Sequence, residues 1–432
     1  MIVVQIIPGS GGSFYCGNCL RDSKFVEALR KEGHQVVKVP MYLPLFANED
    51  DAGEVPVFYG AISIYLKQRF PIFRKAPRWV DKLLNSKPML KLAAGMAGST
   101  DAQGLDEMTV SMLLGEDGKQ REELEVMVDW IAEHLKPDVV HISNALLLGL
   151  AHKLREKIGV PVICSLQDED VWVDVMKPSA RQQVWELMHQ KSVDVDAFIA
   201  VSKFFGDVMQ DRMKIPAEKL HQIYLGVDPV EYRYQNSSEK PRTIGYISRM
   251  CSENGYDIVI DAFIRLKQQP GFDDVKLMVT GGFTPADTKY IKMLKRRIAR
   301  AGLQQWVDYQ FEAIGQPGDE FFSKVAVASV PVRNGEAFGL YLPELMSAGI
   351  PVVQPALGAF PEIVTLSGGG TVYEPNTPEA LAEAWAKMLS NTDDLSRYSQ
   401  QARAGVEKFF NIYDHTREMI ELYQSLLEKK SK

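Results

Sequence analysis

Two glutamates with a glycine between them are the residues of this chain whose types and spacing best suit chemistry. They lie in Gly335–Glu344, which reads Gly-Glu-Ala-Phe-Gly-Leu-Tyr-Leu-Pro-Glu. Glu336 and Glu344 could accept hydrogen bonds from sugar hydroxyls, because an ionised carboxylate is a strong acceptor. Gly339 has no side chain, so a phosphate could approach its main chain closely. The chemistry expected here is therefore the binding of a sugar and a phosphate.

The elements predicted around this segment are a strand before it and a helix within it. An apolar run over Val325–Val330 predicts a buried strand, and the helix is expected to continue to about Ser347. Unpaired backbone N–H groups at a helix start favour anions. The alternative is that each acid only stabilises the helix dipole. For one acid alone that explanation would be preferred, but two acids around Phe338-Gly339 favour a binding site.

Short apolar runs alternate with helical patterns in both halves of the chain. Strands are predicted over Ile2–Ile7, Val36–Val39, Val139–Ile142, Pro161–Ser165, Ala197–Val201, Thr243–Tyr246, Lys276–Thr280, Val307–Phe311, Val325–Val330 and Pro351–Gln354. Helices are predicted near Leu20–Lys31, Glu122–Leu135, Ala145–Ile158, Lys203–Met213 and Tyr413–Lys429. This alternation predicts an α/β fold with two doubly wound, Rossmann-like domains. Ligands of such sheets bind at the carboxyl ends of the strands, here in a cleft between the domains.

The composition is that of a globular protein rather than a fibrous or disordered one. The chain has 432 residues, 46% hydrophobic and 24% charged, with a net charge of −7. This charge argues against nucleic-acid binding, which needs a basic footprint. Four cysteines are too few for a disulfide framework. Without a signal peptide or a membrane-spanning apolar run, a cytoplasmic location is expected.

The glutamate pair resembles the Glu-x7-Glu motif of the retaining glycosyltransferases of family 4, in its Glu-x-Phe-Gly form. The resemblance implies the GT-B fold and a nucleoside diphosphate sugar as donor. It implies that Glu336 contacts the donor sugar as a catalytic residue and that Glu344 binds the ribose hydroxyls. The main chain of the intervening residues, Phe338, Gly339 and Leu340, would bind the diphosphate.

Further blocks within 240–390 resemble the same family. The strand that ends in Arg249 resembles its phosphate-binding strand, and the turn Gly281-Gly282 resembles its glycine-rich turn. Arginine suits a diphosphate leaving group, because its charge is permanent and its donors are forked. The alternative for Arg249 is a surface salt bridge. Its position after a donor-domain strand favours the phosphate role.

Asn254 stands where the family normally has a lysine, five residues after Arg249. The replacement removes one positive charge from the expected diphosphate site. Either Arg333 or another basic side chain compensates for it, or donor binding is weakened or lost. We favour compensation.

The first domain is expected to supply the acceptor side. Gly11 and Gly12 belong to a glycine-rich turn after the first strand, and the alternative is a simple tight turn. His141 ends a strand that resembles a family block and is expected at the cleft as a catalytic residue, with a packed core histidine as the alternative. Gln167 replaces a family histidine, so no general base is implied there. Asp168 is expected to orient an acceptor hydroxyl, unless it is only a solvated loop acid.

Two further features of the first half suggest other chemistry. Cys16 and Cys19 form a Cys-x-x-Cys pair, for which a structural role is preferred over redox or zinc chemistry. Residues 65–91 hold eight Lys or Arg against one acid, with interleaved aromatics. Such a segment suits an anionic membrane surface or a polyanionic acceptor. The preferred alternative is a solvated insertion, because prolines interrupt any long amphipathic helix.

The predicted organisation follows from these elements. Residues 1–230 would form the acceptor-side domain, with an insert at about 46–120. Residues 240–405 would bind the donor, and a last helix at about 408–432 would pack back on the first domain. The expected function is a metal-independent, cofactor-free, retaining sugar transfer to a glycan, lipid or other hydroxyl acceptor. Nucleic acid is not expected as a partner, and any peripheral membrane contact would be made through residues 65–91. The alternatives are a nucleotide-sugar epimerase of this architecture and a catalytically degenerate nucleotide-sugar-binding protein.

Overall fold

The computed structural model describes residues 1–8, 17–41, 106–310 and 318–430. Its contacts divide the chain into two compact units. Among the described residues, the first unit contains 1–8, 18–41, 106–223 and 416–430, and the second contains Gly17 and the described part of Tyr224–His415. In the described part of the chain each unit has one six-stranded parallel sheet.

The sheet of the first unit has the strand order β2-β1-β3-β4-β5-β6. Its strands are β1 Ile2–Ile7, β2 Gln35–Pro40, β3 Val139–Ile142, β4 Val162–Leu166, β5 Ala197–Ala200 and β6 Leu220–Gln222. Its helices are α1 Gly17–Lys31, α5 Asp106–Leu114, α6 Arg121–Trp130, α7 Ala151–Ile158, α8 Glu169–Val173, α9 Pro178–Lys191 and α10 Lys203–Met213. Strand β2 lies on one side of β1, and β3 to β6 follow in order on the other side of β1. Right-handed crossovers therefore place helices on both faces of the sheet.

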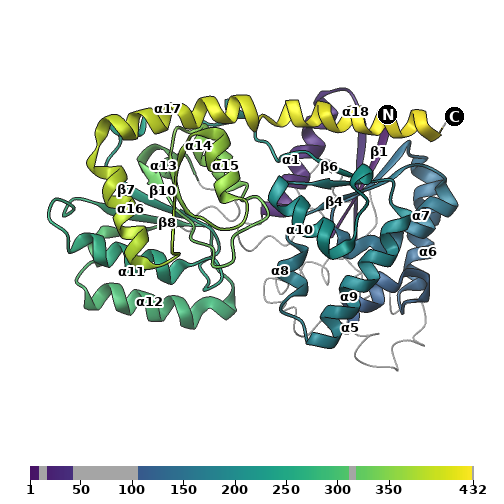
Figure 1. The fold of residues 1–432 in the computed structure, drawn as a ribbon, viewed down its shortest axis with the longest axis horizontal. Coiled ribbons are helices and arrows are strands. Elements are labelled where there is room, and N and C mark those ends of the chain that lie inside the picture. Colours follow the sequence, from purple (N-terminus) through teal and green to yellow (C-terminus); the bar gives the residue numbers. More distant parts are fainter. Residues whose placement is uncertain (9–16, 42–105, 311–317, 431–432) are drawn as a thin grey trace. The chain divides into compact units, whose positions relative to one another are not determined.

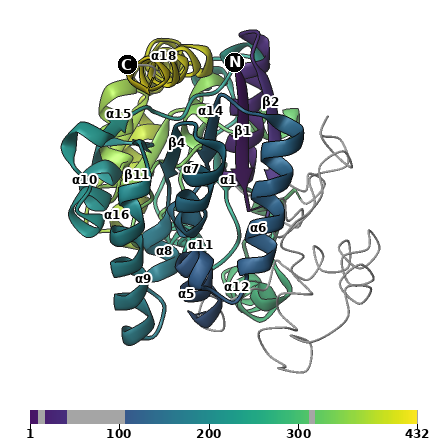
Figure 2. The same ribbon diagram turned by 90° about the vertical axis from the view of Figure 1, so that its right-hand side faces the viewer.

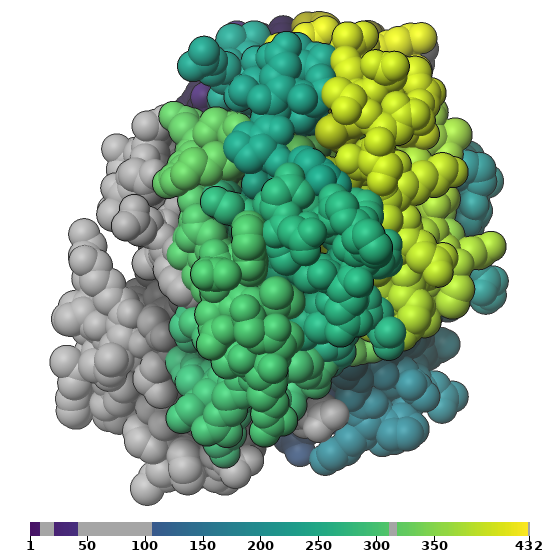
Figure 3. Space-filling view, turned by 90° about the vertical axis from the view of Figure 1, so that its left-hand side faces the viewer, coloured from purple at the N-terminus to yellow at the C-terminus, as the bar shows by residue number. Residues whose placement is uncertain are grey.

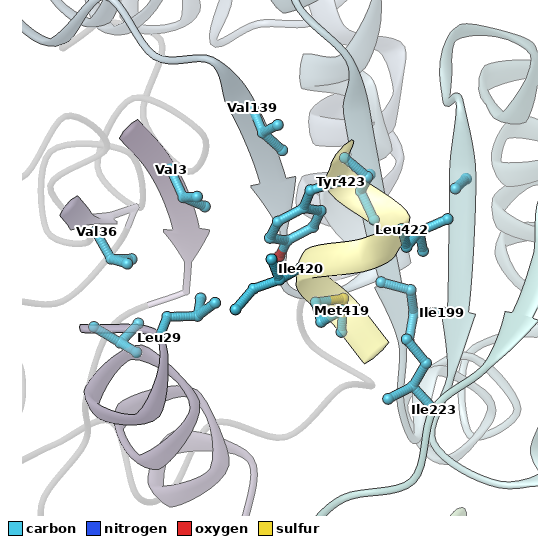
Figure 4. Close-up of a cluster of buried hydrophobic side chains, with 13 residues drawn as sticks. Val3, Leu29, Val36, Val139, Ile199, Ile223, Met419, Ile420, Leu422 and Tyr423 are labelled. Atoms are coloured by element: carbon cyan, nitrogen blue, oxygen red, sulfur yellow. The ribbon is translucent and has the colours of Figure 1, made fainter. Parts of the chain in front are cut away.

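The last helix, α18 Ile412–Lys430, completes the core of the first unit (Figure 4). Tyr423 is fully buried and Met419 is 5% exposed. Together with Ile420 and Leu422 they pack in one cluster with Val3, Leu29, Val36, Val139, Ile199 and Ile223. The apolar stripe expected on this helix is thus buried against β1, β2, β3 and β5 and against α1.

The sheet of the second unit has the order β12-β11-β10-β7-β8-β9. Its strands are β7 Thr243–Ile247, β8 Lys276–Thr280, β9 Val307–Tyr309, β10 Val327–Ala328, β11 Val352–Pro355 and β12 Gly370–Tyr373. Its helices are α11 Tyr256–Lys267, α12 Thr288–Arg300, α13 Asp319–Lys324, α14 Tyr341–Ser347, α15 Phe360–Ser367, α16 Pro378–Ser390 and α17 Thr392–Phe409. Figure 1 shows α11, α12 and α16 along one face of the sheet, and α13, α14, α15 and α17 along the other.

The direction of the strand order reverses between β7 and β10 in this sheet. From β7 the chain goes to β8 and β9 on one side, whereas β10, β11 and β12 follow on the other. The loops after β7 and β10 therefore separate at the middle of the sheet, which is where open α/β sheets bind ligands. Figure 3 shows a face of the second unit on which α11 (teal) and α12 (green) lie next to each other.

The predicted fold class is confirmed, because both units are doubly wound α/β structures with parallel sheets. Strands β1, β3 and β8 have the predicted bounds. The predicted strand Val325–Val330 was too long, since only Val327–Ala328 pair as strand β10. Strands β6 and β12 were not predicted. In the described part of the chain, no helix has both the length and the apolar character needed to span a membrane.

Candidate active site

The loops after β7 and β8 pack tightly against each other at the carboxyl edge of the second sheet. A Cβ atom on Gly281 would lie 2.4 Å from the carbonyl oxygen of Ser248, and the φ of Gly281 is +106°. The N–H of Met250 donates to the carbonyl of Gly282 at 3.0 Å. Only glycine fits this approach without displacing backbone. The predicted glycine-rich turn thus lies directly beside the loop that carries Arg249.

Arg249 is held in a forked ion pair with Asp287. Its Nε donates to Oδ2 at 2.8 Å and its Nη2 to Oδ1 at 2.9 Å, while Nη2 also donates to Oγ1 of Thr284 at 3.1 Å. The Arg249 side chain is 32% exposed. Its pKa is raised although partial burial opposes this, because Asp287 binds the charged form. Arg249 is therefore a permanent, oriented charge that still reaches the surface.

The turn that carries Asn254 is bound from two sides. Asn254 Nδ2 donates to Ser248 Oγ at 2.7 Å, so this amide braces the loop after β7. The side chain of Arg333 packs against the same turn. Its Nε donates to the carbonyl of Ser252 at 2.9 Å and its Nη2 to Asp257 Oδ2 at 2.6 Å. Arg333 is thus close to the position of the missing lysine, but Asp257 neutralises part of its charge.

Glu336 and Gly339 meet in the loop after β10. A methyl group on Gly339 would lie 3.0 Å from Oε2 of Glu336 and 3.3 Å from the ring of Phe360. The φ of Gly339 is +84°, which disfavours any other residue. The loop is anchored by the N–H of Ala359, which donates to the carbonyl of Glu336 at 3.0 Å. The predicted sugar-binding acid therefore lies against the main chain predicted to bind phosphate.

Glu344 lies in α14 and is 2% exposed. The hydroxyl of Tyr232 donates to its Oε1 at 3.2 Å. Burial and the nearby Glu344 charge raise the pKa of Tyr232 well above its usual value, so the hydroxyl keeps its proton. Leu340 precedes the helix and is 5% exposed. The predicted helix end at Ser347 is correct.

Phe338 packs on the two segments at which the chain enters and leaves the second unit. Its ring centroid lies 6.3 Å from that of Tyr224 and 5.7 Å from that of Phe410. Tyr224 also donates from its hydroxyl to Glu362 Oε1 at 2.7 Å. The loop that carries Glu336 is thus fixed by an aromatic cluster, and Phe338 serves as its anchor.

In the first unit, Gln167 and Glu169 are buried after β4. Gln167 Nε2 donates to the carbonyl of Ser143 at 2.7 Å. Glu169 accepts from the N–H groups of Ala145 at 2.9 Å and Gln167 at 2.7 Å. Burial raises the pKa of Glu169 to about 8, although these N–H donors oppose the shift. Asp168 has a φ of +53°, an uncommon conformation outside glycine that clusters at functional sites.

His141 is 1% exposed and lies within the first unit. Its Nδ1 is 2.5 Å from the hydroxyl of Tyr423 and its Nε2 is 2.8 Å from Oγ of Ser165. Burial, and then the nearby Arg21 charge, lower its pKa to about 3. His141 is therefore a neutral, packed ring that joins β3 to α18. These contacts match the packed core histidine that was the alternative for this position.

Several predicted residues lie outside the described part of the chain. These are Gly11, Gly12, Cys16 and the basic segment 65–91. Among the described residues, no group of three or more His, Cys, Asp or Glu side chains could hold a metal ion.

Sequence reasoning missed the side chains that support the predicted ones. Asp287 could have been found, because Thr284 and Asp287 have the Ser/Thr-x-x-acid spacing of a capping box, which the structure contains. Tyr232 carries no such signal, since it lies 112 residues before Glu344 in a stretch predicted only as a linker.

Two family models match this chain. Residues 230–405 match the model of the glycosyl transferases group 1, and residues 120–231 match that of glycosyltransferase family 4.

Two curated relatives illustrate the similarity. The lipopolysaccharide core biosynthesis mannosyltransferase LpsB of Rhizobium meliloti is 28% identical over 207 residues, which cover 47% of this chain and 54% of LpsB. The MMP alpha-(1->4)-mannosyltransferase of Mycolicibacterium hassiacum is 22% identical over 304 residues, 68% of this chain and 71% of that protein. This chain thus spans about half the length of LpsB.

Solved structures share the fold over the whole chain. HepE from Anabaena, in complex with UDP, has a TM-score of 0.68 and 17% identity, and the alignment covers 98% of this chain and 100% of that one. Sucrose-phosphate synthase from Thermosynechococcus elongatus has a TM-score of 0.71 and 17% identity, with 99% of both chains covered. At these identities the likeness establishes the fold.

Proposed function

Since this chain belongs to family 4 of the glycosyltransferases and has their GT-B fold, we propose that it transfers a sugar from a nucleoside diphosphate sugar to an acceptor hydroxyl. The acceptor is a glycan or a lipid-linked glycan, and the anomeric configuration is retained. No metal ion takes part, because side-chain and main-chain groups meet the phosphate charge.

One observation carries this proposal: the Glu336 carboxylate lies so close to Gly339 that a Cβ atom added there would be 3.0 Å from its Oε2. The pair combines an acceptor for sugar hydroxyls with a main chain that carries no side chain and can bind phosphate, in the loop after β10 where the sheet order reverses. In this proposal Glu336 binds the donor sugar, Glu344 binds the ribose, and the main chain of Gly339 and Leu340 binds the diphosphate.

Arg249 stabilises the departing diphosphate. Its guanidinium is oriented by Asp287 before any ligand binds, and a charge that needs no reorganisation favours the transition state. Gly281 and Gly282 let the loop after β8 approach this charge closely. Asp168, on the first unit, orients the acceptor hydroxyl. HepE is bound to UDP in its solved structure, which supports a nucleoside diphosphate as the leaving group.

A thermal-shift panel of UDP-, GDP- and ADP-sugars tests donor binding. Mannosyl donors come first, because two relatives are named mannosyltransferases. A ligand that binds only the folded protein raises its melting temperature. We expect one donor to do so, and Glu344→Ala to abolish the shift. The control is Glu383→Ala, which removes an exposed acid of α16 and should keep the shift. If no donor stabilises the wild-type protein, the proposal is wrong.

Turnover separates transfer from binding alone. With the stabilising donor and a cell extract as a source of acceptors, we expect release of the nucleoside diphosphate and a product with the same anomeric configuration as the donor. Binding without release would instead indicate a nucleotide-sugar-binding protein. Asn254 in place of lysine and Gln167 in place of histidine are the two positions that would then explain the loss.

A further inference from the structure

Tyr232 binds Glu344 through its hydroxyl and is held in place by contacts of its ring and its main chain. The hydroxyl of Tyr232 donates to Oε1 of Glu344 at 3.2 Å. Glu344 is 2% exposed, and a carboxylate so enclosed needs hydrogen-bond donors to stay ionised and oriented. Because burial and the Glu344 charge raise the pKa of Tyr232, the tyrosine is the donor in this bond.

Tyr232 is held in place independently of this bond. Nη1 of Arg403 donates to the carbonyl of Tyr232 at 3.2 Å and to that of Ser347 at 2.9 Å. The ring of Tyr232 packs edge-on against Phe322, with centroids 5.3 Å apart. The main chain of Tyr232 is thus tied to the last residue of α14, and its hydroxyl reaches Glu344 three residues earlier in that helix.

We propose that Tyr232 is a positioning residue for the nucleotide: it holds the Glu344 carboxylate in the orientation that binds the ribose hydroxyls. This inference rests on the proposed function, which assigns the ribose to Glu344. Each carboxylate oxygen has two lone pairs, so Tyr232 and a ribose hydroxyl can bind the same group together. Tyr232 itself does not touch the ligand.

The test pairs a change in the protein with a change in the ligand. Dissociation constants are measured by calorimetry for UDP, GDP and ADP and for their 2′,3′-dideoxy counterparts, with the full-length protein. The wild-type protein should prefer the ribose form of the nucleotide it binds. Tyr232→Phe should reduce this preference about threefold to tenfold, the size of one hydrogen bond, and leave the affinity for the dideoxy form unchanged.

Two variants provide the comparison. Tyr234→Phe removes a hydroxyl from the same segment, on a residue that is 40% exposed, and should keep the wild-type preference. Glu344→Gln removes the carboxylate itself and should lose the preference at least as completely as Tyr232→Phe. The double variant should then be no worse than Glu344→Gln, because Tyr232 acts through that carboxylate.

The outcomes separate the inference from the function on which it rests. If Tyr232→Phe weakens the ribose and dideoxy forms equally, or leaves the preference intact, the tyrosine is only structural and the inference is wrong, while the proposed function stands. If the wild-type protein binds a nucleotide but does not distinguish ribose from dideoxyribose, the ribose role of Glu344 fails and the inference fails with it. If it binds none of the nucleotides, the proposed function fails first.

Discussion

Charged and polar side chains of the second unit are mostly fixed by protein partners before any ligand binds. Asp287 orients Arg249, Tyr232 binds Glu344, and the Asn254 amide braces the loop after β7. Preorganised charges of this kind lower the cost of binding and of charge development, because they need not be reoriented. The number of positive charges near the proposed diphosphate site is then the property that a single substitution can change.

Asn254→Lys restores the charge that the resembling family has at this turn. We expect the dissociation constant for the bound nucleoside diphosphate to fall about threefold to tenfold at low ionic strength, and the gain to shrink in high salt. Isothermal titration at two salt concentrations measures both effects. Glu253→Gln is the matched control, since it changes the net charge by the same amount on the neighbouring, exposed residue. An equal gain from both variants would show that only net charge matters.

Glu169 makes the stability of the first unit depend on pH. Its pKa is about 8 in the folded protein, above the usual 4.5, so its contribution is fully present below about pH 4.5. Between these values the unfolded chain loses its proton and the folded one keeps it, so stability falls as the pH rises to about 8. Urea unfolding of wild type and Glu169→Gln from pH 5 to 9 should show this fall only in the wild type. The exposed Glu186→Gln should behave like wild type, and parallel curves for Glu169→Gln would contradict the prediction.

At the scale of residues, the sequence indicates which side chains suit a binding site better than it indicates the partners that surround each of them. The two glutamates, Gly339 and Arg249 could be singled out because acid, glycine and arginine have distinct roles at a phosphate. Burial of His141 was considered only as an alternative, and its hydrogen bond to Tyr423 could not be foreseen, because the two residues lie 282 positions apart. Hydrogen bonds over such separations leave no periodic trace in a single sequence.

At the scale of elements, the loop between β10 and α14 depends on a conformation that glycine supplies. Gly339→Ala should destabilise the unliganded protein by about 1–2 kcal/mol, because its φ is +84°. Its methyl group would also displace the Glu336 carboxylate, so affinity for the sugar nucleotide should fall about tenfold or more.

Gly302→Ala is the matched control for this prediction. Its φ is +71°, and a Cβ atom there meets nothing within 4 Å. Thermal unfolding should show a similar loss of stability in both variants, while thermal shifts with the donor should show a loss of affinity only in Gly339→Ala. Normal donor binding by Gly339→Ala would contradict the assignment of this loop.

Elements with a strong apolar period were predicted well, and short or polar ones were not. Strand β1 is almost continuously apolar, and its predicted bounds are correct. Strand β6 has three residues, Leu-His-Gln, none of them buried, and β12 reads Gly-Thr-Val-Tyr with only Tyr373 buried. Edge strands of this kind take their conformation from one neighbour rather than from their own pattern, so periodicity does not reveal them.

At the scale of the whole molecule, α18 supplies core residues to a unit that begins at the other end of the chain. A chain that ends at His415 loses Met419, Ile420, Leu422 and Tyr423 from the cluster around β1 and β3. Loss of one such side chain typically costs about 2–5 kcal/mol, so we expect the first unit to unfold and the second to remain folded.

Hydrogen exchange, followed peptide by peptide, measures this outcome. Peptides from 18–41 and 106–223 should exchange rapidly in the shortened chain, and those from 224–415 should stay protected. A chain that ends at Leu427 keeps every residue of the buried cluster and should exchange like the full chain. Protection of the first unit in the chain ending at His415 would show that α18 is dispensable for its core.

The position of α18 also fixes the order in which the protein can mature during synthesis. The ribosome makes β1 before the rest of this unit, yet the side chains that close the core over it, and the hydroxyl that binds His141, come only in the middle turns of α18. The second unit lies entirely between these two parts of the chain and leaves the ribosome earlier than they can meet. Domains generally fold as they emerge, from the N-terminus onward. Here the unit whose first strand is translated first is the one that matures last, so a premature stop codon directly after His415 removes core residues of the first unit and leaves the second unit intact.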